Sequence, residues 1–293
     1  MLSSSAERQY LARIESSFAM AAGMVGELGK PSMNDEHGRQ IIKDAELRLS
    51  QELRKILLRP GEGWLCEEDV DNGDRLDSPI VWVVDPVDGT NELMNGLPEW
   101  SISVGLVVEG TAVAGGVYNP PTRELFLGSL SLGVTYNRQP MVCGNKTNLD
   151  GALLLASRQE FIRGEWARFQ GRNFSVRPTG SIAYKLSLVS VGLADATWTL
   201  SPKHEWDVAA GVALVRSSGG CVSFLGSSQF QLNRKETLLP GLVASGEGLW
   251  RDVNSLVAEV VASHPVADCG SKPAANQNRT EHLQMSLEAA RRR

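Results

Sequence analysis

Residues 80–84 are five consecutive apolar side chains, and they lead directly into the segment Asp85-Pro86-Val87-Asp88-Gly89-Thr90. A short apolar run rich in valine is typical of a buried strand. The strand therefore ends in two carboxylates three residues apart, and Pro86 fixes the backbone between them. Gly89 permits a sharp turn directly after the second carboxylate. The rest of the chain must fold so that something stabilises this pair of charges.

Two carboxylates that lie close together repel each other. At about 4 Å the repulsion is roughly 4 kcal/mol at an effective dielectric constant of 20. A hard divalent cation removes this penalty and can also bind phosphate oxygens. Thr90 begins a segment that suits a short helix, whose free N–H groups would favour an anion. The segment predicts a combined metal and phosphate site, although its residue types also suit a simple strand-ending turn.

Size and composition narrow the class of protein. A chain of 293 residues can bury a full core, as one large domain or as two packed halves. A net charge of −5 argues against a surface that coats a nucleic-acid polymer. No apolar run reaches the roughly 18 residues that span a membrane, and the N-terminus lacks the layout of a signal peptide. The cysteines are scattered without a Cys-x-x-Cys pair, so we expect a cytoplasmic protein without membrane or nucleic-acid partners.

The spacing of apolar residues predicts two halves that meet near residues 144–150. In the first half it predicts two helices, a short strand, the buried strand and an antiparallel meander, over residues 5–28, 40–58, 62–69, 80–84 and 100–130. In the second half strands alternate with helices. The strands are expected at 153–156, 174–176, 196–200 and 242–244, and the helices at 159–169, 181–191, 206–218 and 249–261. We expect an α+β half over residues 1–143, an α/β half over residues 144–262 and a flexible tail over residues 263–293.

Two more acidic stretches accompany the central segment. Glu67 lies in Cys66-Glu67-Glu68-Asp69, and Trp206-Asp207 opens an apolar helix that ends at Gly219-Gly220. The chain therefore contains three motifs in a fixed order: an acidic pair, then Asp-Pro-x-Asp-Gly-Thr, then Trp-Asp. This order resembles the signatures of the inositol monophosphatase superfamily of magnesium-dependent, lithium-sensitive phosphatases. The resemblance covers about residues 5–262. It implies a layered α/β/α/β/α sandwich of the inositol monophosphatase and fructose-1,6-bisphosphatase type, and commonly a homodimer.

The resemblance also implies a set of metal ligands, all of them oxygen atoms. They are the carboxylates of Glu67, Asp85, Asp88 and Asp207 and the main-chain carbonyl of Val87. Asp85 would bridge two Mg²⁺ ions, and a third, weaker ion would lie near Glu67. Oxygen-only ligation suits Mg²⁺ rather than zinc. Two such ions would activate the attacking water and stabilise the leaving oxygen.

The family's pair that orients the attacking water falls on Thr90 and Asp44, which with Glu67 form the predicted catalytic set. A solvated helix carboxylate is an open alternative for Asp44, and Lys43 stands where the family usually has a small hydroxyl residue. The backbone N–H groups of Gly89 and Thr90 are expected to hold the phosphate. The further predicted substrate contacts are Asp88, Arg158, Lys185 and Asp207.

The substrate is open between two branches of the superfamily. Leu200 stands where animal-type inositol monophosphatases carry a glutamate that contacts the inositol ring. Three residue pairs look like those of the 3′(2′),5′-bisphosphate nucleotidase branch, namely Asn91-Glu92, Ser157-Arg158 and Gly180-Ser181. Residues 100–105 are closer to the inositol phosphatases. We expect a phosphomonoesterase that acts on an inositol phosphate or on 3′-phosphoadenosine 5′-phosphate. A fructose-1,6-bisphosphatase-like sugar phosphatase and a non-catalytic regulatory protein that binds phosphate or a nucleotide are the alternatives.

Overall fold

The computed structural model describes residues 2–25, 36–169, 171–226 and 231–263. The chain divides into a compact unit over residues 1–257 and a second unit over residues 258–293. All three sheets of the described residues belong to the first unit, and only residues 258–263 of the second are described. The predicted flexible tail therefore lies outside the described residues from 264 onward, as do residues 26–28 of the first predicted helix.

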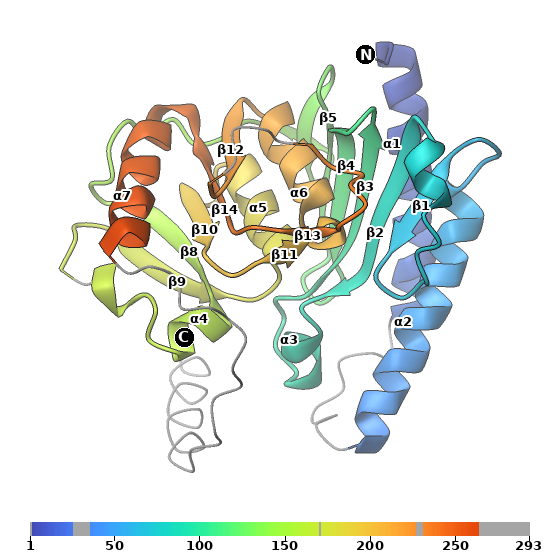
Figure 1. The fold of residues 1–293 in the computed structure, drawn as a ribbon, viewed down its shortest axis with the longest axis horizontal. Helices are drawn as coiled ribbons and strands as arrows, with labels where there is room; N and C mark the ends of the chain where they lie inside the picture. The colour runs from blue at the N-terminus through green and yellow to red at the C-terminus, as the bar shows by residue number, and fades with distance from the viewer. Residues whose placement is uncertain (1, 26–35, 170, 227–230, 264–293) are drawn as a thin grey trace. The chain divides into compact units, whose positions relative to one another are not determined.

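Helices α1 (Ser4–Met24) and α2 (Glu36–Leu57) pack together and cover one face of the larger sheet (Figure 1). Each helix buries a stripe of apolar side chains at helical spacing, which includes Ile14 and Phe18 in α1 and Ile42 and Leu49 in α2. Both helices were predicted from this spacing, and both predictions are confirmed over the described residues.

The larger sheet has seven strands that lie side by side in the order of the chain. They are β1 (Gly63–Cys66), β2 (Ile80–Asp88), β3 (Ser101–Val108), β4 (Thr111–Asn119), β5 (Glu124–Ser129), β6 (Gly133–Tyr136) and β7 (Gln139–Met141). The β1–β2 pair is parallel and each later pair is antiparallel. The predicted meander is confirmed. It continues into β6 and β7, which the sequence analysis missed because both are short and β7 contains Pro140.

Helices α5 (Ile182–Ser190) and α6 (Glu205–Ser217) pack against each other between the two sheets (Figure 1). Helix α6 lies very close to the larger sheet. A Cβ at Gly115 in β4 would come within 2.6 Å of the Ala210 carbonyl oxygen, and one at Gly105 in β3 within 2.9 Å of the Ala209 Cβ. Glycines at these two positions therefore set the depth at which α6 rests on the sheet.

The smaller sheet has five strands in the order β12-β14-β10-β8-β9. They are β8 (Leu153–Ser157), β9 (Ser175–Thr179), β10 (Ala196–Thr199), β12 (Gly220–Phe224) and β14 (Leu242–Gly246). Strands β9, β8 and β10 run parallel, and β14 pairs antiparallel with both β10 and β12. The strand β12 was not predicted, because it is short and begins at Gly220.

Short elements and one further helix complete the chain. They are η2 (Asp74–Asp77), α3 (Thr90–Met94), α4 (Arg158–Ile162), η3 (Ala167–Phe169), the β11 (Lys203–His204) and β13 (Leu238–Leu239) pair, η4 (Glu247–Leu249) and α7 (Trp250–Ser263). The prediction of a single helix over residues 159–169 is wrong, because two short helices lie there instead. Gly164, at a φ of +79°, follows the end of α4, and η3 begins only at Ala167.

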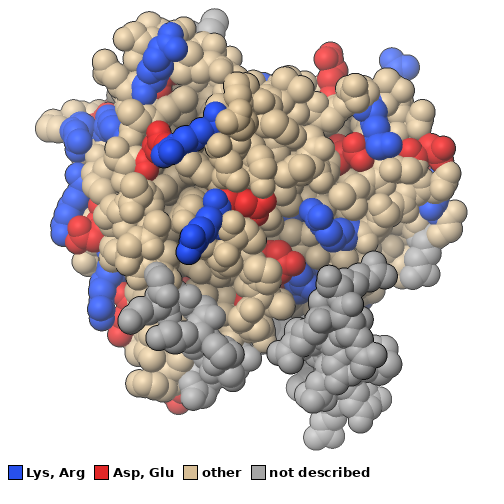
Figure 2. All heavy atoms as spheres, turned by 180° about the vertical axis from the view of Figure 1, so that it is seen from behind, with Lys and Arg blue, Asp and Glu red and all other residues tan. Residues whose placement is uncertain are grey.

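The first unit is thus built from helices, sheet, helices, sheet and a final helix, since the start of α7 lies beyond the smaller sheet (Figure 1). The predicted layered α/β/α/β/α sandwich is confirmed. None of the described helices combines the length and the apolar character that crossing a membrane requires. Figure 2 shows basic and acidic side chains interspersed on one face of the described residues.

Candidate functional site

The central carboxylates lie where β2 ends and α3 begins. The pairing of β2 with β3 is irregular between Asp85 and Asp88, so the strand bends at Pro86. One Asp85 oxygen accepts a hydrogen bond from the Val87 N–H at 2.9 Å. Gly89 then takes a φ of +98°, in the left-handed region that favours glycine. This turn directs the chain into α3 and places Thr90 at the start of that helix.

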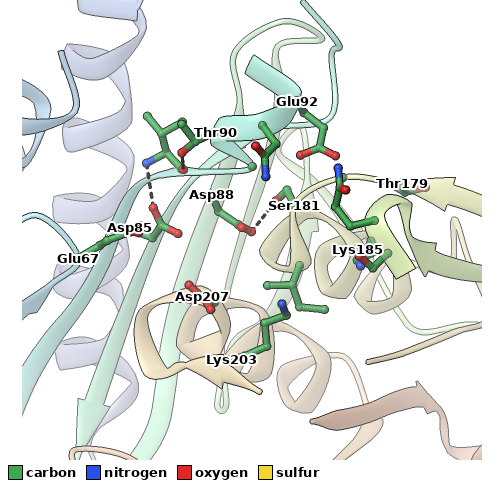
Figure 3. Close-up of a pocket in the computed structure, with 17 residues that line it drawn as sticks. Glu67, Asp85, Asp88, Thr90, Glu92, Thr179, Ser181, Lys185, Lys203 and Asp207 are labelled. Carbon is green, nitrogen blue, oxygen red and sulfur yellow. Dashed lines mark hydrogen bonds between the residues drawn. The ribbon is translucent and has the colours of Figure 1, made fainter. Parts of the chain in front are cut away.

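Three distant segments bring carboxylates to one pocket of about 250 Å³. Glu67 follows β1, Asp85 and Asp88 end β2, and Asp207 lies in the first turn of α6 (Figure 3). The structure therefore brings together all four acidic residues that the sequence marked as metal ligands. Val87, Gly89 and Thr90 line the same pocket.

Burial and mutual repulsion raise the pKa of each of these acids. Burial raises the pKa of Glu67 to about 7, with a further contribution from Asp207, and burial together with Asp88 raises that of Asp207 to about 7. The pKa of the fully buried Asp85 is well above its usual range, because of burial and then of Glu67. The pKa of Asp88 is raised by burial as well, although hydrogen bonds oppose the shift. The pocket thus holds more negative charge than its own surroundings compensate.

This donor set fits a hard divalent cation, because it consists of oxygen atoms that repel one another until a cation lies between them. Among the described residues no three His, Cys, Asp or Glu side chains are already gathered around one point. The four carboxylates therefore line the pocket wall without forming a closed cage. Because like charges repel, four carboxylates that share one pocket are expected to stand apart.

The predicted pairing of Thr90 with Asp44 is wrong. The Asp44 side chain is exposed and accepts a hydrogen bond from the Gln40 amide at 2.9 Å. The hydroxyl of Thr90 instead lies 3.0 Å from a Glu46 carboxylate oxygen and 3.1 Å from the Val87 carbonyl oxygen. Glu46 is only 8% exposed, and burial raises its pKa to about 7.

Helical periodicity explains this correction. Glu46 lies four residues after Ile42 and three before Leu49, so it belongs to the buried stripe of α2 that faces the sheet. Asp44 lies on the opposite face of the helix. The signal was therefore present in the sequence, as a carboxylate in phase with the apolar stripe.

The N-terminus of α5 holds Asp88. One Asp88 oxygen accepts hydrogen bonds from the Ser181 hydroxyl at 2.6 Å and from the Ala183 N–H at 2.7 Å. The Ser181 oxygen in turn accepts from the Tyr184 N–H at 2.9 Å and lies 2.9 Å from the Ser101 hydroxyl. Ser181 takes a φ of +51°, unusual for a residue with a side chain. No single sequence motif links these residues, so their role was not predicted.

The two predicted cationic contacts differ. Lys185 lines the pocket, whereas Arg158 does not. The guanidinium of Arg158 is bonded to the Glu99 carboxylate at 2.8 Å, and its Nε lies 3.7 Å from Glu92. The charge of Arg158 is already paired beside the pocket, which argues against a direct substrate contact, and that role stays a prediction. The lining residues that the sequence analysis connected with substrate choice are Asn91, Glu92, Ser157, Gly180 and Ser181, and the other lining residues are Gln159, Thr179, Ile182 and Lys203.

Comparisons with known proteins agree with this architecture. The chain matches the inositol monophosphatase family over residues 5–264. It is 32% identical to an inositol-1-monophosphatase of Synechocystis over 234 residues, which are 75% of this chain and 79% of that protein. It is 31% identical to the Nus factor SuhB of Xylella fastidiosa over 197 residues, which are 64% of this chain and 68% of that protein.

Among solved structures, an inositol monophosphatase from Anabaena (Nostoc) has the same fold, with a TM-score of 0.70 at 24% identity. The match covers 89% of this chain and 98% of that chain. The layered fold, the order of the acidic segments and the family match over nearly the whole chain lead to one conclusion. The chain belongs to the inositol monophosphatase family.

Proposed function

We propose that the chain is a Mg²⁺-dependent phosphomonoesterase that hydrolyses a small phosphate ester. One observation carries the proposal: four carboxylates from three distant segments line one pocket, next to a hydroxyl that is hydrogen-bonded to a buried carboxylate. The four carboxylates supply oxygen ligands for the metal. The Thr90 hydroxyl and the Glu46 carboxylate, which are hydrogen-bonded to each other, can orient a water molecule.

Glu67, Asp85, Asp88, Asp207 and the Val87 carbonyl oxygen are the groups that would hold the ions. When bound, Mg²⁺ supplies Lewis acidity toward the phosphate oxygens and lowers the pKa of the attacking water. The protein's own hydrogen bonds hold two of these carboxylates in position. Asp88 is held by Ser181 and Ala183, and the His204 N–H donates to Asp207 at 2.8 Å.

Thr90 and Glu46 are proposed to orient the water. When Glu46 is ionised, the Thr90 hydroxyl donates its hydrogen to Glu46, and its lone pairs are then available to accept a hydrogen bond from water. A buried carboxylate whose pKa lies near 7 is well matched to this work at neutral pH. Glu46 thus takes the role that the sequence analysis gave to Asp44. The N–H groups of Gly89 and Thr90 remain the proposed phosphate contacts.

The substrate is proposed to be small, because the pocket lies just below the usual range of ligand sites, about 300 to 1,000 Å³. An inositol phosphate and 3′-phosphoadenosine 5′-phosphate are the leading candidates, and a sugar bisphosphate is a third. A homodimer, a cytoplasmic location, lithium sensitivity and a division into halves at residues 143 and 144 are proposed on the family resemblance and the order of the elements.

Phosphate release from these three compounds, measured with Mg²⁺ and with a chelator, tests the proposal. Release is expected with Mg²⁺ and not with the chelator. Release from none of them, or undiminished release in the chelator, would contradict it.

A second candidate is a non-catalytic binding protein. It is favoured by a relative whose name, Nus factor SuhB, describes a factor rather than an enzyme. Under this alternative the pocket would bind phosphate compounds without releasing phosphate. Calorimetric titration of the compounds that are not hydrolysed separates the two candidates.

A further inference from the structure

Two lysines reach the pocket from the second half of the chain. Lys185 comes from α5 and is 2% exposed, and Lys203 comes from β11 and is half-buried. In Figure 3 both lie on the other side of Asp88 from Glu67 and Asp85. The pocket therefore has a wall of carboxylates and, facing it, a wall with two cations.

Neither ammonium group forms a hydrogen bond or an ion pair within 4.0 Å with a group in the described part of the chain. A lysine as deeply buried as Lys185 is rare without a partner. Burial lowers its pKa to about 8, and the charge of Lys203 acts in the same direction. The two cations repel each other, and an anion bound between them would remove this repulsion.

The acids that face Lys185 do not serve as its partner, because each one is already engaged. They are Glu160, Asp88 and Glu92. Glu160 accepts hydrogen bonds from the Thr199 hydroxyl and the Trp166 indole. Asp88 is held by α5, and Glu92 lies 3.7 Å from the Arg158 guanidinium. These groups stabilise a positive charge at Lys185 from a distance and leave its donors free for a ligand.

We propose that Lys185 and Lys203 bind a second anionic group of the substrate, a phosphate or a carboxylate separate from the ester phosphate. This inference rests on the proposed function and narrows its substrate class to phosphate esters that carry a further negative group. Ser157, Gln159 and Thr179, polar residues that also line the pocket, can contribute hydrogen bonds to the part of the substrate between its two anions. A phosphate ester of a neutral polyol would leave both ammonium groups without a partner.

The test compares matched substrates on the full chain with Mg²⁺. The pairs are adenosine 3′,5′-bisphosphate with adenosine 3′-monophosphate, fructose 1,6-bisphosphate with fructose 1-phosphate, and 2-phosphoglycerate with glycerol 2-phosphate. In at least one pair, kcat/KM is expected to be about 100-fold higher for the member with the second anion, since each charged hydrogen bond contributes about tenfold or more. The first two pairs report a phosphate and the third a carboxylate. Equal kcat/KM within threefold in all three pairs would overturn the inference.

Variants assign the effect to the lysines. Lys203→Met is expected to reduce the preference for the second anion about tenfold, and Lys203→Arg to restore most of it. Lys55→Met is the matched control, because Lys55 lies exposed on α2, where it pairs with Glu52. An equal loss on both members of a pair in Lys203→Met would show a structural role only and would overturn the assignment.

A binding measurement without turnover supplements the kinetics. Titration of the preferred pair into Asp85→Asn protein is expected to show at least about tenfold tighter binding of the doubly anionic member. Equal binding of both members would count against the inference. Failure of the two proposals can be told apart. Absence of phosphate release from every compound overturns the proposed function, whereas equal release within each pair overturns the lysine subsite alone.

Discussion

The two walls of the pocket are built in different ways. The carboxylate wall centres on Asp85 and Asp88 at the end of one buried strand, within four consecutive residues. The lysine wall takes Lys185 from a helix and Lys203 from a two-residue strand, and they meet only through packing of the second half. A wall whose centre is one continuous segment can be recognised from the motif of that segment, whereas a wall assembled only from separate elements requires the fold. The difference also separates metal binding, expected on the first wall, from substrate choice, expected on the second.

The strongest challenge to this division is removal of one carboxylate. Asp88→Asn or Asp207→Asn is expected to reduce kcat by about 10³-fold, because a metal position loses a charged ligand. The same change removes a carboxyl group whose pKa is raised by burial, which means that its ionised form destabilises the fold. The melting temperature of the variant without metal is therefore expected to equal or exceed that of the wild type without metal. Phosphate-release kinetics and thermal unfolding measure the two effects. Full activity in either variant would end the two-metal account.

The second prediction separates two carboxylates on one helix. Glu46→Gln is expected to reduce kcat by about 10²-fold or more, because Thr90 loses its ionised acceptor. Asp44→Asn, two residues away on the exposed face, is expected to change kcat less than about twofold. Parallel kinetics of the two variants make the comparison, and a larger effect at Asp44 would restore the sequence-based assignment.

Glu46 also predicts a pH dependence. Its pKa is raised from 4.5 to about 7, because burial disfavours the ionised form. Since the ionised form is the acceptor for Thr90, activity is expected to fall as the pH drops through about 7, well before an exposed glutamate would protonate. A rate profile from pH 5 to 9 should show this acidic limb in the wild type and not in Glu46→Gln. An identical limb in the variant would assign it to another group.

A backbone substitution tests whether the walls depend on how α6 rests on the sheet. Gly115→Ala is expected to destabilise the fold by about 1–3 kcal/mol, because the new Cβ would lie 2.6 Å from the Ala210 carbonyl oxygen. Gly23→Ala in α1 is the control, since its Cβ would have no neighbour within 4 Å. It should be neutral or stabilising by up to about 1 kcal/mol. Urea unfolding measures both. Equal free energies of unfolding for Gly115→Ala and the wild type would mean that the backbone shifts at this contact to make room for the methyl group.

The smallest expected effect is at Arg158. Its guanidinium is paired with Glu99 at 2.8 Å and does not line the pocket. Arg158→Met is therefore expected to raise KM by less than about threefold. Lys203→Met, in contrast, is expected to reduce the preference for the second anion about tenfold. A loss of substrate binding as large as that of Lys203→Met would place Arg158 in the second wall after all.

The sequence predicts local features of this molecule far better than distant ones. The buried strand, the meander and the helices α1 and α2 follow from apolar periodicity, since each pattern lies within one segment. Breaks set by a single residue, such as the end of α4 near Gly164, are harder to place. Asp44 matches the family's motif by position, but the helical phase of α2 buries Glu46 and leaves Asp44 exposed. The hydrogen bond from Ser181 to Asp88 joins residues 93 apart in the chain, and Lys203 meets the other lining residues only in the folded molecule, so no local pattern encodes either.

Ser181 has a consequence for what the molecule can tolerate at that position. Its single hydroxyl donates to Asp88, accepts from the Tyr184 N–H and meets the Ser101 hydroxyl, in a backbone conformation that costs most residues about 1–3 kcal/mol. Glycine would relieve the backbone but lose all three bonds, and alanine would lose the bonds and keep the strain. A branched residue such as threonine would add steric conflict to the same strain. The orientation of the Asp88 side chain thus depends on a position where glycine, alanine and threonine would each serve less well than serine.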